Sequence, residues 1–255
     1  MTTNAARHTT FLILLLSVLA MLLHGPIVQF DHYHEFADTR VWLGVADPGD
    51  VLSNLAFALA GVYGLRVMLR LPGGASVPST IPYVGFFAAM LLTAVGSTWY
   101  HLAPGDARLV WDRLPIALAC AALLVAVWAE TLSCSARSVM PVLLAALAAA
   151  ALSVAWWVWT NGQGGGDLRP YLLLQVAPLV LIPIWQAGAA RPVSERKVFG
   201  VAILLYVLAK LCELADGRIL HVLGFVSGHT LKHLLAGVAA AVVAAMLQVR
   251  GETVG

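Results

Sequence analysis

Three histidines in this sequence have a spacing that would let them bind a metal ion. His229 and His233 are four residues apart, and Ser97 and His101 have the same separation. Residues i and i+4 of an α-helix lie on one face, so each pair would project from one side of its helix. Three imidazole nitrogens suit zinc, and in catalytic zinc sites the fourth position is left for water. We therefore take His101, His229 and His233 as candidate zinc ligands.

Asp112 and Ser97 are the candidate catalytic residues beside these ligands. A carboxylate at Asp112 could accept a proton from the water, which three histidines cannot do. Ser97 could hydrogen-bond the water or a polarised carbonyl. Simpler interpretations remain open: Asp112 could pair with Arg113, Ser97 could bond its own backbone, and two histidines four residues apart occur often by chance.

The composition places these residues in a membrane protein. The chain has 255 residues, of which 60% are hydrophobic and 11% charged, whereas soluble domains average about 25% charged residues. This excludes an ordinary cytosolic enzyme and a disordered chain. The net charge of +2 is too small to indicate a nucleic-acid partner. The three cysteines form no CxxC pair, so neither a disulfide framework nor a thiolate metal site is expected.

The expected fold is all-α, a polytopic bundle of transmembrane helices. A membrane-crossing helix needs about 20 apolar residues. We expect an N-terminal helix in residues 1–30 and a seven-helix domain in residues 31–255. Gly- and Pro-rich breakers such as Pro72-Gly73-Gly74 separate individual helices. The expected stretches are 10–30, 50–71, 80–102, 108–131, 138–160, 170–190, 196–215 and 224–248.

The first stretch has some features of a signal peptide, namely Arg7 followed by a short apolar segment, Phe11 to Leu23. No small-x-small cleavage site follows it. We therefore expect a retained helix that extends to Phe30. Cleavage would leave seven helices and change nothing downstream.

The loop charges predict the orientation. Eight Lys and Arg residues lie on the side of the N-terminus and five on the other side, which favours both termini in the cytoplasm. The opposite face is acidic and rich in Trp. Twelve Arg against three Lys, with abundant Ala, are typical of a GC-rich bacterial genome. The expected location is the bacterial inner membrane.

The polar residues lie at matching ends of their expected helices. His101 is near the end of one helix, and Asp112 and His229 are near the starts of two others. With alternating helix directions, these ends share the outer side, within about two turns at 1.5 Å per residue. Ionisable residues in membrane helices are costly and indicate function. Lys210 and Glu213 are expected to pair with each other or with Lys232.

These motifs resemble the alkaline ceramidase family, whose superfamily includes the adiponectin-type receptors. The resemblance covers roughly residues 31–248 and is closest to bacterial ceramidase-like membrane proteins. It is carried by Ser97-x-x-x-His101, Asp112 eleven residues later, His229-x-x-x-His233, the segments 96–101 and 227–233, and Ser53-Asn54.

The resemblance implies a seven-helix core and hydrolysis of the amide of ceramide, or of a related N-acyl lipid, to a fatty acid and an amine base. It implies that His101, His229 and His233 bind Zn²⁺, and that Asp112 and Ser97 contact the zinc-bound water. Asp112 would act as base and then as acid, and Ser97 would stabilise the oxyanion. The implied partners are the membrane lipid substrate and the bilayer. The oligomeric state and the acyl chain are left open.

The eukaryotic members of that family also carry a calcium site in an acidic segment before the first core helix. Asp47, Glu35 and Asp38 are the corresponding candidate Ca²⁺ ligands here. The run Asp47-Pro48-Gly49-Asp50-Val51 lacks the Trp-Asn pair of the family pattern. The alternative for this segment is a solvated interfacial loop.

Three other functions stay open. The first is a lipid-binding, receptor-like protein of the same superfamily without significant turnover. The second is a haem-binding redox protein, although His229 and His233, one turn apart, could not both ligate one haem iron from opposite sides. The third is a proton-coupled transporter that would use Lys210 and Glu213.

Overall fold

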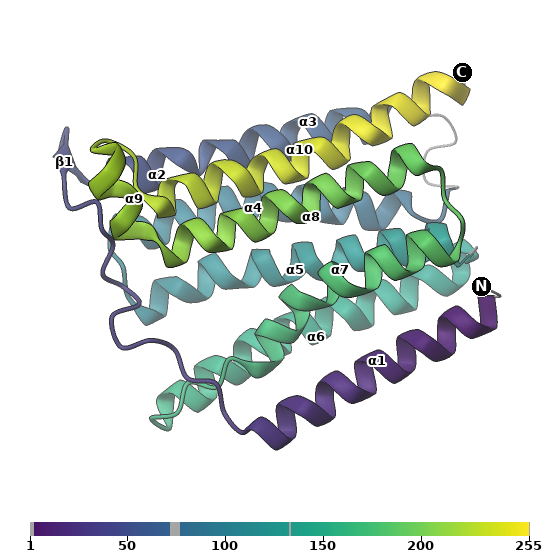
Figure 1. Ribbon diagram of the computed structural model, residues 1–255, viewed down its shortest axis with the longest axis horizontal. Helices are drawn as coiled ribbons and strands as arrows, with labels where there is room; N and C mark the ends of the chain where they lie inside the picture. Colours follow the sequence, from purple (N-terminus) through teal and green to yellow (C-terminus); the bar gives the residue numbers. More distant parts are fainter. Residues whose placement is uncertain (1–2, 72–76, 133, 255) are drawn as a thin grey trace. The chain divides into compact units, whose positions relative to one another are not determined.

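The computed structural model describes residues 3–71, 77–132 and 134–254, which are almost entirely helical (Figure 1). A short antiparallel hairpin pairs β1 (Val41–Trp42) with β2 (Val45–Ala46). The helices are α1 (Thr3–His24), α2 (Pro48–Ser53), α3 (Leu55–Arg70), α4 (Thr80–Leu102), α5 (Asp106–Thr131), α6 (Ala136–Gly162), α7 (Arg169–Gly188), α8 (Val193–Leu214), α9 (Asp216–Leu223) and α10 (Gly228–Val254). The predicted all-α polytopic bundle is confirmed.

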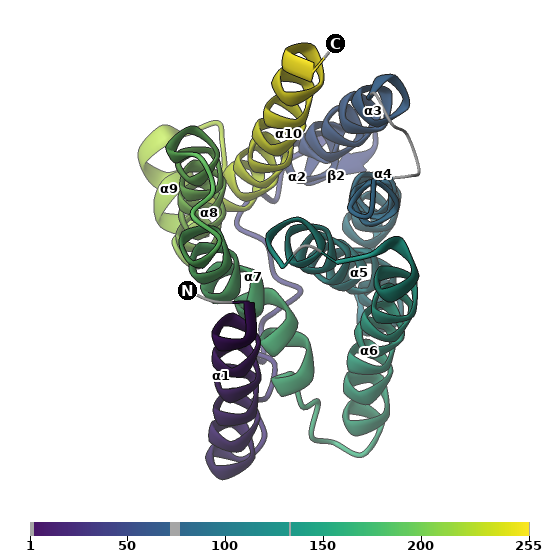
Figure 2. The same cartoon turned by 90° about the vertical axis from the view of Figure 1, so that its right-hand side faces the viewer.

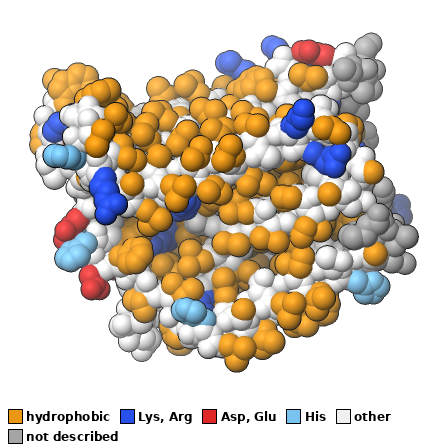
Figure 3. Space-filling model, viewed as in Figure 1, with side chains coloured by type: hydrophobic (Ala, Val, Ile, Leu, Met, Phe, Trp, Pro, Cys, Tyr) orange, Lys and Arg blue, Asp and Glu red, His pale blue; other side chains and the backbone are white. Residues whose placement is uncertain are grey.

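Seven helical segments in the described part of the chain are long and apolar enough to cross a membrane. An eighth is present if α8 and α9, which meet at a bend of 84°, form one span. Hydrophobic side chains predominate on the face drawn in Figure 3, and large apolar residues such as Leu23, Leu69 and Val95 are exposed. A continuous apolar surface of this kind needs lipid around it. The chain is thus an integral membrane protein by the length and composition of its helices.

The predicted first helix is too long at its C-terminal end. α1 ends at His24 and not at Phe30. Gly25 adopts a positive φ of 82°, a conformation that ends helices readily. Pro26 then lacks the backbone N–H that a further helical turn would need.

Two other predicted helices differ from the structure. The stretch predicted as 50–71 starts at Pro48 and divides at Asn54 into α2 and α3. The stretch predicted to begin at residue 224 begins at Gly228, and the residues before it form the separate helix α9. Gly224 ends α9 in the left-handed conformation, with φ 75°, as glycine often does. The predicted loop Pro72-Gly73-Gly74 lies outside the described residues.

Contacts group the chain into two compact units. The first comprises Met1–Asp31, Gly73–Phe86 and Ala117–Lys197, and the second comprises His32–Pro72, Phe87–Ile116 and Val198–Gly255. The division into an N-terminal helix and a hydrolase domain from residue 31 stays a prediction. All the candidate site residues belong to the second unit.

In the first unit, α7 packs against both α1 and α6. Asp167, just before α7, is the polar link between α7 and the end of α1. Its carboxylate is bound by Arg169 at 2.8 Å and by the Trp156 indole at 2.9 Å. It also accepts the Ile27 backbone N–H, while Arg169 donates to the Met21 carbonyl. Burial alone would raise the pKa of Asp167, but the hydrogen bonds from Arg169 and Trp156 outweigh it and lower the pKa to about 2.

In the second unit, α10 lies alongside α3 and α2, as Figures 1 and 2 show. Glycines make close helix contacts possible there. A Cβ at Gly237 of α10 would lie 2.7 Å from the Cβ of Ala56, and one at Gly64 of α3 would collide with the ring of Phe87 on α4. Small residues at such contacts are typical of membrane helix packing. α3 is therefore held closely against α4 and α10, the two helices that carry the histidines.

Replacing Asp167 by Asn should lower thermal stability at pH 7, because it removes the charge that Arg169 and Trp156 bind. Loss of a charge-assisted hydrogen bond, as when an amide NH2 replaces one carboxylate oxygen, costs about 1.5–3 kcal/mol. A lowered pKa stabilises the fold above the unfolded pKa, and this contribution is lost as the pH falls towards 2. The melting temperature in detergent should thus fall more steeply between pH 7 and 2.5 for the wild type than for Asp167→Asn. Asp31→Asn, at an exposed site, is the control and should match the wild type.

Candidate metal centre

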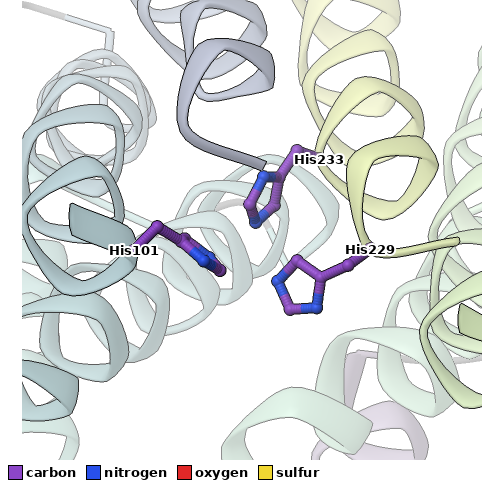
Figure 4. A group of neighbouring side chains, drawn as sticks. All are labelled: His101, His229 and His233. Atoms are coloured by element: carbon purple, nitrogen blue, oxygen red, sulfur yellow. The ribbon is translucent and has the colours of Figure 1, made fainter. Parts of the chain in front are cut away.

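The three predicted histidine ligands lie together. His101, the second-last residue of α4, faces His229 and His233 from the first two turns of α10 (Figure 4). One ring nitrogen from each histidine lies within 4.8 Å of the other two. The ring centroids are 4.8 Å apart for His101 and His229 and 5.1 Å apart for His101 and His233. The i, i+4 spacing on α10 thus places His229 and His233 on one face of the helix, as predicted from the sequence.

The burial of these rings fits a metal site. His101 and His233 are each 1% exposed and His229 is 7% exposed. His101 Nδ1 and His229 Nε2 are buried without a hydrogen-bond partner among the described residues. Buried polar atoms in folded proteins nearly always have a partner, and a metal ion held between the three rings would supply it. The group can therefore hold a metal ion, and an all-imidazole set suits Zn²⁺, Cu²⁺, Ni²⁺ or iron.

The orientation of His233 is set by α2. Its Nδ1 lies 2.8 Å from Ser53 Oγ and 3.2 Å from the carbonyl oxygen of Asp50. Ser53 Oγ donates its own proton to the same carbonyl at 3.1 Å, so its oxygen can accept the Nδ1–H of His233. Metal-bound histidines usually donate their second ring N–H in this way, which fixes the tautomer. Nε2 of His233 is left to face the other two rings.

The carboxylate of Asp50 holds the start of α10. Its Oδ1 accepts hydrogen bonds from Ser227 Oγ at 2.8 Å and Thr230 Oγ1 at 2.6 Å. Ser227 in turn accepts the backbone N–H of Thr230, which is the usual bond of a helix N-cap. One aspartate therefore fixes both the helix that carries two ligands and, through its carbonyl, the ring of His233.

The segment before the hairpin covers two of the histidines. The ring centroid of Phe36 is 4.6 Å from that of His101 and 4.7 Å from that of His229. Asp216 connects this segment to α10, because its two oxygens accept hydrogen bonds from the backbone N–H groups of Ala37 and His229. Such an apolar cover limits water access and lowers the local dielectric.

Ser97 and Asp112, the predicted catalytic residues, are both buried in the second unit. Ser97 Oγ has no hydrogen-bond partner among the described residues, so the alternative that it bonds its own backbone is wrong. Asp112 is not one of the converging ligand residues. Its neighbour Arg113 stacks its guanidinium over Tyr33, 5.0 Å from the ring centroid. The roles of Ser97 and Asp112 stay predictions.

A close helix contact brings α5 to Ser97. A Cβ at Gly96 would collide with the carbonyl oxygen of Trp111 and would lie 3.5 Å from the backbone nitrogen of Asp112. Only glycine permits this approach. It places the backbone of Asp112 next to the turn of α4 that carries Ser97 and, four residues later, His101.

The candidate calcium ligands do not form a converging group in the described part of the chain. Glu35 is exposed and lies 2.9 Å from His32. Both oxygens of Asp38 are bound by Arg40, at 2.6 and 2.7 Å, and these hydrogen bonds lower the pKa of Asp38. Burial raises the pKa of Asp47 to about 6, together with the charges of the neighbouring carboxylates of Asp50, Asp38 and Asp216. Calcium binding at these residues stays a prediction.

Two further sequence predictions have an outcome here. The pairing of Lys210, Glu213 and Lys232 is confirmed, because the Glu213 carboxylate binds both ammonium groups.

The interpretation of residues 47–51 as a solvated loop is wrong for Asp50, which is fully buried in α2. Pro48 at the first turn was the missed signal, since proline favours that position in a helix. The contacts of Asp50 and Phe36 with α10 and the histidines could not be predicted from spacing.

A comparison with models of known protein families and with curated proteins finds no match for this chain.

Ser53→Ala should weaken metal binding by about 10- to 100-fold, because it removes the oxygen that orients His233. His233→Ala should abolish binding. The measurement is the metal content of purified protein and its affinity in competition with a chelator. Ser153→Ala, at a buried serine of α6 that bonds its own backbone, is the matched control. Wild-type affinity in Ser53→Ala would contradict the orienting role.

Proposed function

We propose that this chain is a zinc-dependent intramembrane hydrolase that cleaves the amide bond of ceramide or a related N-acyl lipid, releasing a fatty acid and an amine base. The observation that carries the proposal is the convergence of His101, His229 and His233 in a buried group next to the α4–α5 contact at Gly96. A carboxylate, Asp112, and a hydroxyl, Ser97, flank that contact.

Zinc is the proposed metal because three neutral imidazoles with a free fourth position are typical of catalytic zinc sites. The residues that would hold it are His101, His229 and His233. The chemistry that Zn²⁺ supplies when bound is Lewis-acid activation of the amide carbonyl and of the attacking water.

Asp112 is the proposed general base and acid. Asp112 is 8% exposed, and a carboxylate in a largely water-excluded site can take up and release a proton. It accepts a proton as the water oxygen bonds to the amide carbon. It then returns that proton to the amine nitrogen as the C–N bond breaks, so that one residue serves both steps.

Ser97 is the proposed oxyanion donor. Its buried Oγ–H has no acceptor among the described residues and lies on the turn of α4 before His101. A preorganised donor of this kind stabilises the negative charge that develops on the amide oxygen. Because it is already desolvated, it costs little reorganisation during the reaction.

The position of the site along its helices favours a lipid substrate. His101 is at the end of α4, His229 is the second residue of α10, and Asp112 is the seventh residue of α5. At 1.5 Å per residue, Asp112 lies roughly 9 Å from the start of its helix. An N-acyl lipid carries its amide at this depth, just below the headgroup, while its acyl chain extends into the bilayer.

We also propose that both termini are cytoplasmic and that the site opens to the outer face. Eight crossings, with α8 and α9 as one span, return the chain to its starting side, and the loop charges favour that side as the cytoplasm. A reporter fused after Gly255 should then behave as cytoplasmic. A periplasmic reporter would invert the orientation.

Asp112→Asn should keep the metal and the fold but lose hydrolysis by about 10²–10⁴-fold, the range for general acid–base catalysis. Ser97→Ala should also keep the metal and lose rate, and His101→Ala should lose both metal and activity. The assay incubates purified protein with a panel of N-acyl lipids, with and without a chelator, and measures the fatty acid released. Asp31→Asn is the exposed control.

Two results would count against this mechanism. Loss of metal in Asp112→Asn would make Asp112 a ligand or a support of the ligands. Full activity in the same variant would remove the proposed base, and a lipid-binding protein without turnover would then explain the site better.

A further inference from the structure

Three charged side chains form a cluster next to the metal centre that the proposed hydrolysis does not use. Lys210 and Glu213 lie on α8 and Lys232 lies on α10. Each lysine Nζ is 2.9 Å from one oxygen of Glu213. An ammonium group has three N–H donors, and the hydrogen bond to Glu213 uses one of them in each lysine.

The charge of this cluster does not cancel. One lysine would neutralise Glu213, and the second adds a net charge of +1. Ionised side chains within apolar membrane segments are costly to insert, so such residues are usually functional. Lys210 lies on α8, which together with α9 forms an apolar segment bent by 84°. The ammonium N–H groups that Glu213 does not accept are therefore available to an anion.

The cluster lies beside the candidate ligands. Lys232 follows His229 by three residues and directly precedes His233, so it projects from the same side of α10 as His229. The charges of Lys210 and Lys232 both act on His229 and His233. The Asp112 carboxylate is within electrostatic range of both lysines. A molecule held at the metal and Asp112 could reach the lysines with another of its groups.

The cluster is also accessible, in contrast to the histidines. The Lys210 side chain is 41% exposed, Glu213 21% and Lys232 16%. An anion could reach the free N–H donors of Lys210 without unpacking the helices.

We infer that Lys210 and Lys232 bind the anionic headgroup of the lipid, so that the preferred substrates are N-acyl lipids whose amine part carries a carboxylate or a phosphate. This inference rests on the proposed hydrolysis. The new carboxylate of the released fatty acid forms at the carbon that reacts beside the metal, so it is not the group that reaches the lysines. The acyl chain is apolar. The headgroup on the amine side is the remaining part of the molecule.

Binding of two lipids that differ in one charge tests this inference. N-hexadecanoylglycine carries a free carboxylate, and its methyl ester has the same chain and no charge. The wild-type protein in detergent at pH 7 should bind the acid roughly tenfold more tightly than the ester, which is the lower range for a charge-assisted hydrogen bond. Lys210→Gln should remove most of that preference and leave the affinity for the ester and the metal content unchanged.

Two further variants separate this effect from a loss of structure. Glu213→Gln removes the competing carboxylate, so the affinity for the acid should rise while the affinity for the ester does not. Lys197→Gln is the matched control, because Lys197 is an exposed lysine near the other end of α8. Its preference for the acid should equal that of the wild type.

The outcomes separate the two proposals. Equal wild-type affinity for acid and ester, or equal weakening of both by Lys210→Gln, overturns the anion site. A lysine-dependent preference without hydrolysis of any N-acyl lipid supports the anion site and contradicts the proposed function. Hydrolysis of acid and ester with the same KM supports the proposed function and overturns the anion site.

Discussion

The buried carboxylate of Asp50 is the interaction on which the candidate metal centre depends. It accepts hydrogen bonds from Ser227 and Thr230 at the start of α10, while the carbonyl of the same residue faces Nδ1 of His233. Removing this acceptor would leave the buried Thr230 hydroxyl without its acceptor, although Ser227 Oγ could still donate to Thr230 Oγ1 at 3.0 Å. It would also loosen the start of α10, whose first two turns carry both of its histidines. A buried hydrogen-bond acceptor is costly to lose, because the donors that it binds stay desolvated without a partner. We therefore expect the short helix α2 to act as the anchor of the site.

Close helix packing provides the second constraint. Three glycines stand where a side chain would collide: Gly64 against Phe87, Gly237 against Ala56, and Gly96 against the Trp111 carbonyl. These contacts hold α3 against α4 and α10, and α4 against α5. A ligand set drawn from two helices needs such fixed distances, because a shift of one ångström changes the geometry of a site substantially. The glycines thus determine the positions from which the histidines project.

The sequence predicted the fold and the histidine group because both depend on local periodicity. Long apolar stretches mark the helices, and the spacing of His229 and His233 places both on one face. Asp50 could not be found in this way, because its partners Ser227 and Thr230 are about 180 residues away. The end of α1 at His24 depends on one residue, Gly25, whose φ is 82°. The bend of 84° between α8 and α9 falls at Ala215, a residue that the hydropathy pattern does not distinguish. The environment of the acidic residues could not be predicted either, because Glu35, Asp38 and Asp50 are alike in sequence but bind different partners in the structure.

The exposed fractions of the side chains indicate that the proposed reaction and the proposed recognition of the lipid headgroup use different residues. The histidines are at most 7% exposed and held by fixed hydrogen bonds and aromatic packing, which suits a metal that must keep one geometry. The lysines of the neighbouring cluster are more exposed, and they share one carboxylate. A headgroup anion that replaced part of the contact with Glu213 would exchange one ion pair for another, so binding would cost little desolvation. If the proposed function holds, selectivity for the lipid can therefore change by substitutions on α8 without disturbing the ligands on α4 and α10.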